Sequence, residues 1–226
     1  MSGGASRAVK LGVRLGLSAA HARRLAALKT PAQVQDFIDR IPHNHEPDGD
    51  CCRSAGATLA INRAHCIEGA FVAAIALWMQ GHPPLLLDLK ADERDDDHVV
   101  ALFKQRGCWG AISKTNHVWL RWRDPVYRSL RELAMSYMHE YTLRRNKTLR
   151  QYSRPFDLRR IDAKRWVAPA NEHCWDVADE IDATRHYRLI GPAQARNLRK
   201  RDAMEMRADR ILQYKKPRKA KRARHD

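Results

Sequence analysis

Apolar and polar positions divide the first part of the chain into two short helices. Residues 18–29 form the first, and residues 30–42 form the second with one apolar face made of Val34, Phe37, Ile38 and Ile41. Thr30 stands where an N-cap is expected and Pro31 takes the first helical position. Both segments are therefore predicted to be helical, and the polar stretch 43–50 that follows is predicted to be a loop.

A fully apolar helix is predicted from Cys66 to Gln80. Small and large apolar residues surround it on every side, so it should lie in the protein core. Gly81 follows the last turn and Pro83 stands just beyond, as is usual where a helix ends. This helix is too short to span a bilayer, and Glu68 in its first turn counts further against a membrane segment.

Short apolar runs after this helix predict a small antiparallel sheet. The strands are expected at Leu85–Leu89, His98–Phe103 and 108–113, with His117–Trp122 continuing the sheet. The run "KADERDDD" is predicted to be a charged loop. Another helix is expected to open at Asp124-Pro125, with an apolar face made of Val126, Leu130, Leu133, Ala134, Tyr137 and Tyr141.

The remainder of the chain is more basic and less periodic. It is expected to hold one short helix around Trp175–Ile181 and a charged helical stretch over 192–214. The order of elements predicts an α+β fold, in which the buried helix packs on the small antiparallel sheet and other helices flank it. We divide the chain into a flexible N-terminus (1–17), a core (18–145), a basic helical extension (146–213) and a disordered basic tail (214–226).

The amino-acid composition indicates a surplus of positive charge and a cellular compartment. Lys and Arg number 42 against 26 Asp and Glu, and seven of the basic residues lie between Lys215 and Arg224. This surplus favours an anionic partner, either an acidic protein or nucleic acid, which the tail would bind. The five cysteines show no framework spacing and no secretory leader is visible, so a reducing cytoplasm is expected.

Cys66 is the first candidate for chemistry because of its place at the start of the buried helix. Unsatisfied N–H groups and the positive end of the helix dipole favour a thiolate there. His98 opens a strand and could serve as the base, and Ser113 or Asn116 could orient its ring. Glu68 is interpreted as a first-turn partner of the helix dipole. No cofactor follows from these residues.

The segments "HCIEGAFVAAIALWMQGHPPLLLDL", "DDDHVVALF" and "GCWGAIS" resemble the transglutaminase-like branch of the papain-type cysteine enzymes. By this resemblance Cys66 matches the nucleophile, His98 the base and Trp109 the tryptophan that precedes the third catalytic position. Ser113 stands at that third position, where the family usually has Asp, and Asn116 is the alternative. The resemblance implies acyl transfer or amide hydrolysis through a thioester, with a protein or peptide amide as substrate.

Three other interpretations of the sequence remain open. The same fold could be catalytically inactive and serve as a binding module for an anionic partner. Zinc could bind in the stretch that holds His43, His45, Cys51 and Cys52, although the spacing differs from that of structural zinc sites. The alternation of Trp119, Arg121, Trp122 and Arg123 could present a stacking surface to single-stranded nucleic acid, or simply form a half-buried strand.

Overall fold

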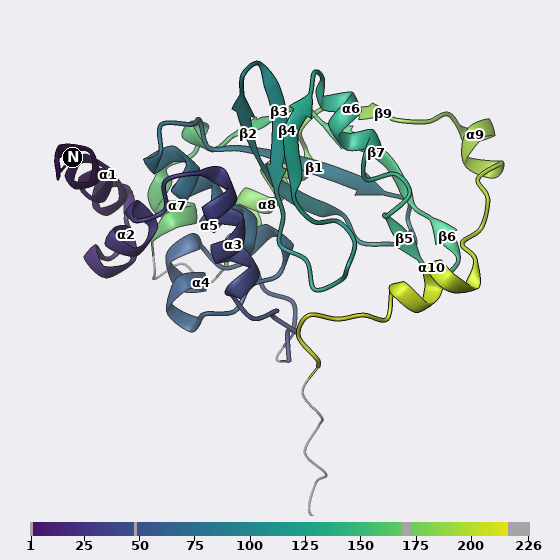
Figure 1. Cartoon of the computed structure of the whole chain (residues 1–226), viewed down its shortest axis with the longest axis horizontal. Coiled ribbons are helices and arrows are strands. Elements are labelled where there is room, and N and C mark those ends of the chain that lie inside the picture. The colour runs from purple at the N-terminus through teal and green to yellow at the C-terminus, as the bar shows by residue number, and fades with distance from the viewer. Residues whose placement is uncertain (1, 48, 169–172, 217–226) are drawn as a thin grey trace, which may run out of the picture.

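The computed structural model describes residues 2–47, 49–168 and 173–216. It is an α+β fold in which a central antiparallel sheet is covered by helices on one face and by a smaller layer on the other (Figure 1). The predicted fold class is confirmed. The predicted disordered tail lies outside the described residues from position 217 onward.

The first five helices gather on one side of the sheet (Figure 1). They are α1 (Ser2–Leu15), α2 (Ala19–Ala26), α3 (Pro31–Arg40), α4 (Ala55–Ile61) and α5 (Cys66–Met79). The expected cap of α3 is present, because the Thr30 hydroxyl accepts the backbone N–H of Gln33 at 3.2 Å. The N-terminus was predicted to be flexible, but it forms α1, which packs against α2 and α5.

Helix α5 is the centre of the core on this side. Most of its residues are fully buried, as its all-round apolar sequence predicts. It ends at Met79, and Gly81 follows with a φ of 96°, a left-handed conformation that glycine adopts without steric cost. The backbone N–H of His82 then bonds the carbonyl of Leu77 at 3.0 Å and satisfies one of the terminal carbonyls of the helix.

The main sheet has the strand order β4-β3-β2-β1-β7-β9, with β8 also paired to β1. Its strands are β1 (Leu85–Ala91), β2 (His98–Gln105), β3 (Cys108–Ile112), β4 (Arg123–Tyr127), β7 (Leu149–Ser153), β8 (Phe156–Asp157) and β9 (His186–Arg188). Alternate residues of β2 divide between two apolar clusters: Val99 joins the α5 side, whereas Val100 faces the side of α6 (Leu130–Met135). The three strands predicted after the buried helix are confirmed.

Three sequence-based expectations for the second half of the chain are wrong. Residues 117–122 form no strand, and the predicted helix at Asp124-Pro125 is instead the strand β4, with α6 starting only at Leu130. Because β4 lies at the sheet edge, Pro125 removes no donor that a further strand would need. The supposed helical extension 146–213 supplies β7 beside β1, because the inner strand β1 requires a hydrogen-bonding partner on both edges.

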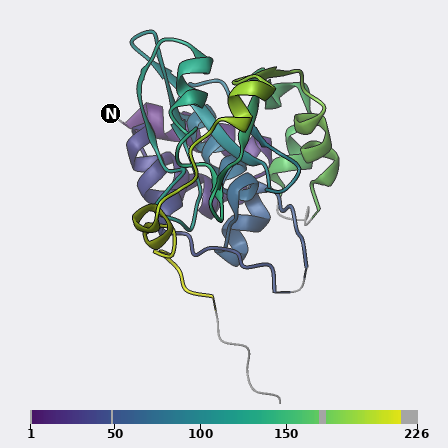
Figure 2. The same cartoon turned by 90° about the vertical axis from the view of Figure 1, so that its right-hand side faces the viewer.

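The remaining elements of the second half of the chain are short. These are β5 (Thr142–Leu143), which pairs with β6 (Asn146–Lys147), the 3-10 turn η1 (Leu158–Arg160), and the helices α7 (Ala163–Val167), α8 (Trp175–Asp182), α9 (Pro192–Arg196) and α10 (Ala203–Ala208). The segment from α9 to α10 crosses the side of the molecule that faces the viewer in Figure 2. Beyond α10, the side chains of Gln213 and Tyr214 both donate to the carbonyl of Asp39 at 2.8 Å, which ties the described C-terminal segment to the end of α3.

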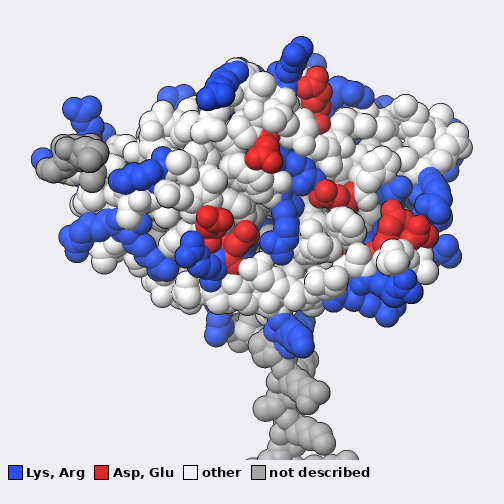
Figure 3. Space-filling model, viewed as in Figure 1, with Lys and Arg blue, Asp and Glu red and all other residues white. Residues whose placement is uncertain are grey.

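Charge is distributed broadly over the surface. Figure 3 shows Lys and Arg spread across the visible face, with Asp and Glu in a few small groups among them. None of the described helices combines the length and the apolarity that crossing a bilayer requires.

Candidate active site

The thiol of Cys66 lies at the first residue of α5, where the sequence places it. The first N–H groups of a helix have no intrahelical partner and carry the positive end of the dipole, so they favour a negative sulfur. Residue Cys66 is partly exposed, and a cavity of about 640 Å³ opens above it. His98, Trp119 and Tyr141 line the same cavity.

His98 reaches this cavity as the first residue of β2, and its ring is held by Ser113. The His98 Nε2 atom lies 2.8 Å from Ser113 Oγ, and both residues are buried. The Ser113 hydroxyl donates its only hydrogen to the carbonyl of Leu120, so towards His98 it can only accept. We therefore assign the proton of the neutral ring to Nε2, which leaves Nδ1 as the nitrogen available to the thiol.

The backbone of Ser113 is clamped from α3 by a residue that sequence reasoning missed. Gln35 accepts the Ser113 N–H at 2.9 Å through Oε1 and donates to the Ser113 carbonyl at 2.9 Å through Nε2. Gln35 itself is 6% exposed. The sequence shows only that Gln35 adjoins Val34 of the apolar face of α3, and a glutamine that is buried there needs partners for both ends of its amide.

Asn116, the alternative to Ser113, serves a different contact. Its Nδ2 donates to the Tyr214 carbonyl at 2.9 Å and its Oδ1 accepts the Tyr214 N–H at 2.8 Å. The structure thus places Cys66 and His98 on one cavity, with Ser113 against the His98 ring, and uses the Asn116 side chain to hold the C-terminal segment. Trp109 lies on β3 under the Lys104 ammonium, with Nζ 5.0 Å from the ring centre.

The electrostatics of the site favour the thiolate form of Cys66. Burial acts to raise the pKa of this thiol, but hydrogen bonds from His65 and His98 and the charges of both rings outweigh it and lower the pKa to about 5. The opposite holds elsewhere: burial raises the pKa of Cys51 to about 11 and that of Cys174 to about 12. Burial likewise raises the pKa of Cys52.

His65 is the second residue whose part in the site was not foreseen. Its Nδ1 lies 3.9 Å from Cys66 Sγ, while its Nε2 lies 2.6 Å from the Cys51 carbonyl oxygen. Burial acts to lower the pKa of this ring, but the Cys66 sulfur, the Glu68 carboxylate and the Cys51 carbonyl together raise it to about 9. The His-Cys dipeptide followed by an acid at the third helical position was the sequence signal for this cluster.

Glu68 is more than a partner of the helix dipole. It is fully buried, and its carboxylate accepts the backbone N–H of His65 at 3.0 Å, an N–H of the Asn44 amide at 3.2 Å and the Arg53 guanidinium at 3.1 Å. These donors compensate for the loss of water around the charge.

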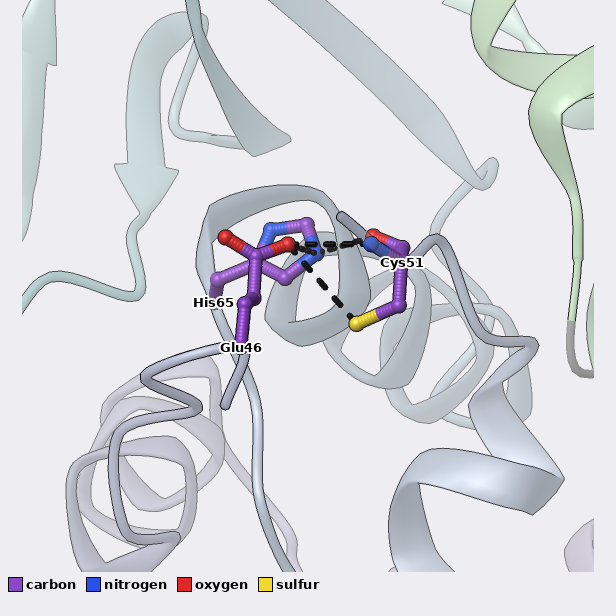
Figure 4. Close-up of side chains that lie close together, drawn as sticks. All are labelled: Glu46, Cys51 and His65. Carbon is purple, nitrogen blue, oxygen red and sulfur yellow. Dashed lines mark hydrogen bonds and ion pairs between the residues drawn. The ribbon is translucent and has the colours of Figure 1, made fainter. Parts of the chain in front are cut away.

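The atoms around His65 also meet the distance requirement for a metal ion. One ligand-type atom each from Glu46, Cys51 and His65 lie within 4.8 Å of one another (Figure 4). However, the Arg53 guanidinium lies 2.7 Å from Cys51 Sγ, and His65 Nε2 already bonds the Cys51 carbonyl. We therefore interpret the cluster as a hydrogen-bonded network rather than a metal centre.

The geometry does not support a metal ion at the other two candidate sites either. His43 and His45, named in the zinc hypothesis, contact each other edge to face with ring centres 4.7 Å apart. A second group is made of Asp88, Asp97 and Asp182. Lys90 forms ion pairs with Asp97 and Asp182, and the His186 ring contacts Asp88 at 2.9 Å, so each of these carboxylates already has a partner in the protein.

Comparisons with known proteins add little to this geometry. No protein-family model matches the chain, and no curated protein matches it. Among solved structures, the chain is similar to LapG of Legionella pneumophila in an EGTA-treated form, with 15% sequence identity, a TM-score of 0.35, and coverage of 48% of this chain and 69% of that chain. A likeness of that degree carries no argument about activity, so the functional proposal depends on the site.

Proposed function

We propose that this protein is a cysteine-dependent acyltransferase or amide hydrolase in which Cys66 is the nucleophile. The observation that carries the proposal is a single cavity lined both by a thiol at a helix N-terminus and by His98, whose ring is held by Ser113. His98 is the acid and base, and Ser113 is the positioning residue that orients it. The substrate class is a protein or peptide amide.

The chemistry balances with these groups alone. The Cys66 thiolate attacks the amide carbon and forms a C–S bond, while the carbonyl oxygen becomes an oxyanion that the free N–H groups at the start of α5 can receive. The C–N bond then breaks, and the amine leaves with the Nδ1 proton of His98, which enters the reaction as an imidazolium. Water or a second amine attacks the thioester, gives its proton to His98 and releases the thiolate.

Site-resolved alkylation tests the nucleophile without knowledge of the substrate. A brief pulse of iodoacetamide at mildly acidic pH should label Cys66 faster than Cys51, Cys52, Cys108 and Cys174, because only thiolates react. The rate should rise as the pH increases through about 5, since that is where the Cys66 thiol loses its proton. Equal labelling of Cys66 and the other cysteines would reject the proposal.

Acyl transfer itself can be followed with p-nitrophenyl acetate as an artificial donor. We expect a single acetyl group on Cys66, detected by peptide mass spectrometry, and none in Cys66→Ser. In His98→Asn the acetyl-enzyme should decay more slowly, because the base that takes the proton of the attacking water is lost; general acid–base catalysis contributes about 10²–10⁴-fold. Alkylation without any acetyl transfer would favour the alternative, an inactive binding module.

A further inference from the structure

The ring of His65 is fixed in one orientation by the atom on its far side. Nε2 lies 2.6 Å from the carbonyl oxygen of Cys51, and a carbonyl can only accept a hydrogen bond. Nε2 therefore carries a proton, and Nδ1 is the nitrogen that faces Cys66 Sγ at 3.9 Å. In this orientation the ring is neutral if Nδ1 is bare and cationic if Nδ1 also carries a proton.

Two carboxylates decide between these forms. Oε1 of Glu46 lies 3.7 Å and Oε2 of Glu68 lies 3.6 Å from His65 Nε2. The Glu68 carboxylate accepts the backbone N–H of His65 and pairs with Arg53, and it is fully buried, so its field is little screened. Negative charge close to Nε2 favours a second proton on the ring, at Nδ1, and Nδ1 faces the Cys66 sulfur.

His98 differs from His65 in the groups that lie close to Nε2 of the ring. Behind His98 stands the hydroxyl of Ser113, which is neutral. In this site the carboxylates that can stabilise an imidazolium, Glu46 and Glu68, therefore lie next to His65 and not next to His98. His98 is correspondingly free to give up its proton during a reaction, whereas His65 is held in the charged form.

We propose that His65, charged by Glu68 and Glu46, is a positioning residue that keeps Cys66 as a thiolate by a permanent ion pair, so that His98 is reserved for proton exchange with the substrate. This division of roles rests on the proposed function, and it explains how the site can work with Ser113 where an acid is expected. The raised pKa of His65, about 9, agrees with it.

Other titratable groups surround the pair and must be considered in any pH experiment. Around Cys66 they are His98 from β2, Tyr141 from the segment after α6, and Cys52; around His65 they are Glu46, Glu68, Cys51, Arg53 and His43. The pKa of His43 is lowered to about 4 by burial and by neighbouring positive charge, so this ring is neutral in the range where Cys66 ionises fully. It provides a matched control in the same cavity.

The experiment measures the pH at which alkylation of Cys66 is half-maximal, by mass spectrometry after iodoacetamide pulses from pH 4 to 10. The midpoint is the proper readout because thiolates of higher pKa are intrinsically more nucleophilic, which masks a change in rate at one pH. The wild type should have its midpoint near pH 5. His65→Gln should raise it by at least about one unit, a tenfold change in the ionisation constant, and His43→Gln should leave it in place.

A measurement on the unaltered chain covers the case in which His65→Gln fails to fold. In ¹⁵N-histidine NMR at pH 7, both ring nitrogens of His65 should be protonated. A neutral His65 ring, or a His65→Gln midpoint equal to that of the wild type, overturns the inference. Failure of the proposed function is a separate result, since it would show as slow labelling of Cys66 in the wild type.

Discussion

Replacing Ser113 by Ala removes one hydroxyl that makes two buried hydrogen bonds. One is accepted from His98 Nε2 at 2.8 Å and the other is donated to the Leu120 carbonyl. Ser113 is 1% exposed, so water cannot readily take either place. Each buried polar group left without a partner costs about 1–3 kcal/mol, so the loss of two partners should lower the free energy of unfolding by about 2–6 kcal/mol in all.

The same substitution should change the reactivity of Cys66. Without Ser113 the His98 ring loses the contact that fixes its tautomer and orientation, and the effect by which this ring lowers the pKa of the Cys66 thiol should weaken. We expect the alkylation midpoint of Cys66 to move to higher pH. Urea unfolding followed by circular dichroism gives the stability change, and site-resolved alkylation gives the midpoint.

Ser153→Ala is the matched control. Ser153 is also fully buried in the sheet, and its hydroxyl accepts the backbone N–H of Asp88 at 2.9 Å, so this variant should lose about 1–3 kcal/mol of stability. It lies outside the cavity of Cys66 and should leave the alkylation midpoint unchanged. If Ser113→Ala kept the stability of the wild type, or shifted the midpoint no more than Ser153→Ala, our account of how Ser113 holds His98 would be wrong.

The remaining predictions concern the end of α5 and the C-terminal segment. Gly81→Ala should cost about 1 kcal/mol in urea unfolding, because an added Cβ meets no atom within 4 Å and the cost is only that of the φ of 96°. Gly191→Ala, at a φ of −79°, should cost less. Asn116→Ala should increase amide hydrogen exchange around Tyr214, since both backbone groups of that residue lose their partner, and it should leave the alkylation midpoint of Cys66 in place. A shifted midpoint would instead implicate Asn116 in orienting His98.

The elements that could be predicted are those with a local cause. The N-cap of α3 and the glycine that ends α5 are visible as residue types at fixed offsets, and the apolar content of α5 marks it as buried. The strand β4 was missed because its proline suggests a helix start, and only a neighbouring strand on one side makes that proline acceptable. Likewise, nothing in the sequence near Leu149 indicates that β7 pairs with β1.

The side-chain contacts of the candidate site join residues that are far apart in the sequence. Gln35 meets Ser113 across 78 positions of sequence, and Asn116 meets Tyr214 across 98. Between Ser113 and Asn116 the local pattern offers no preference, because both are small polar residues near the end of a strand. The choice is made by which partners the remote segments bring to each of them.

Sequence alone determined that a cysteine begins the central buried helix and that a histidine begins a core strand, since periodicity and capping are properties of neighbouring residues. Only the tertiary structure decided which polar groups surround that sulfur. It placed the buried carboxylate of Glu68 behind His65 and a hydroxyl behind His98, because the field at a buried atom depends on groups that are close in space rather than in the chain.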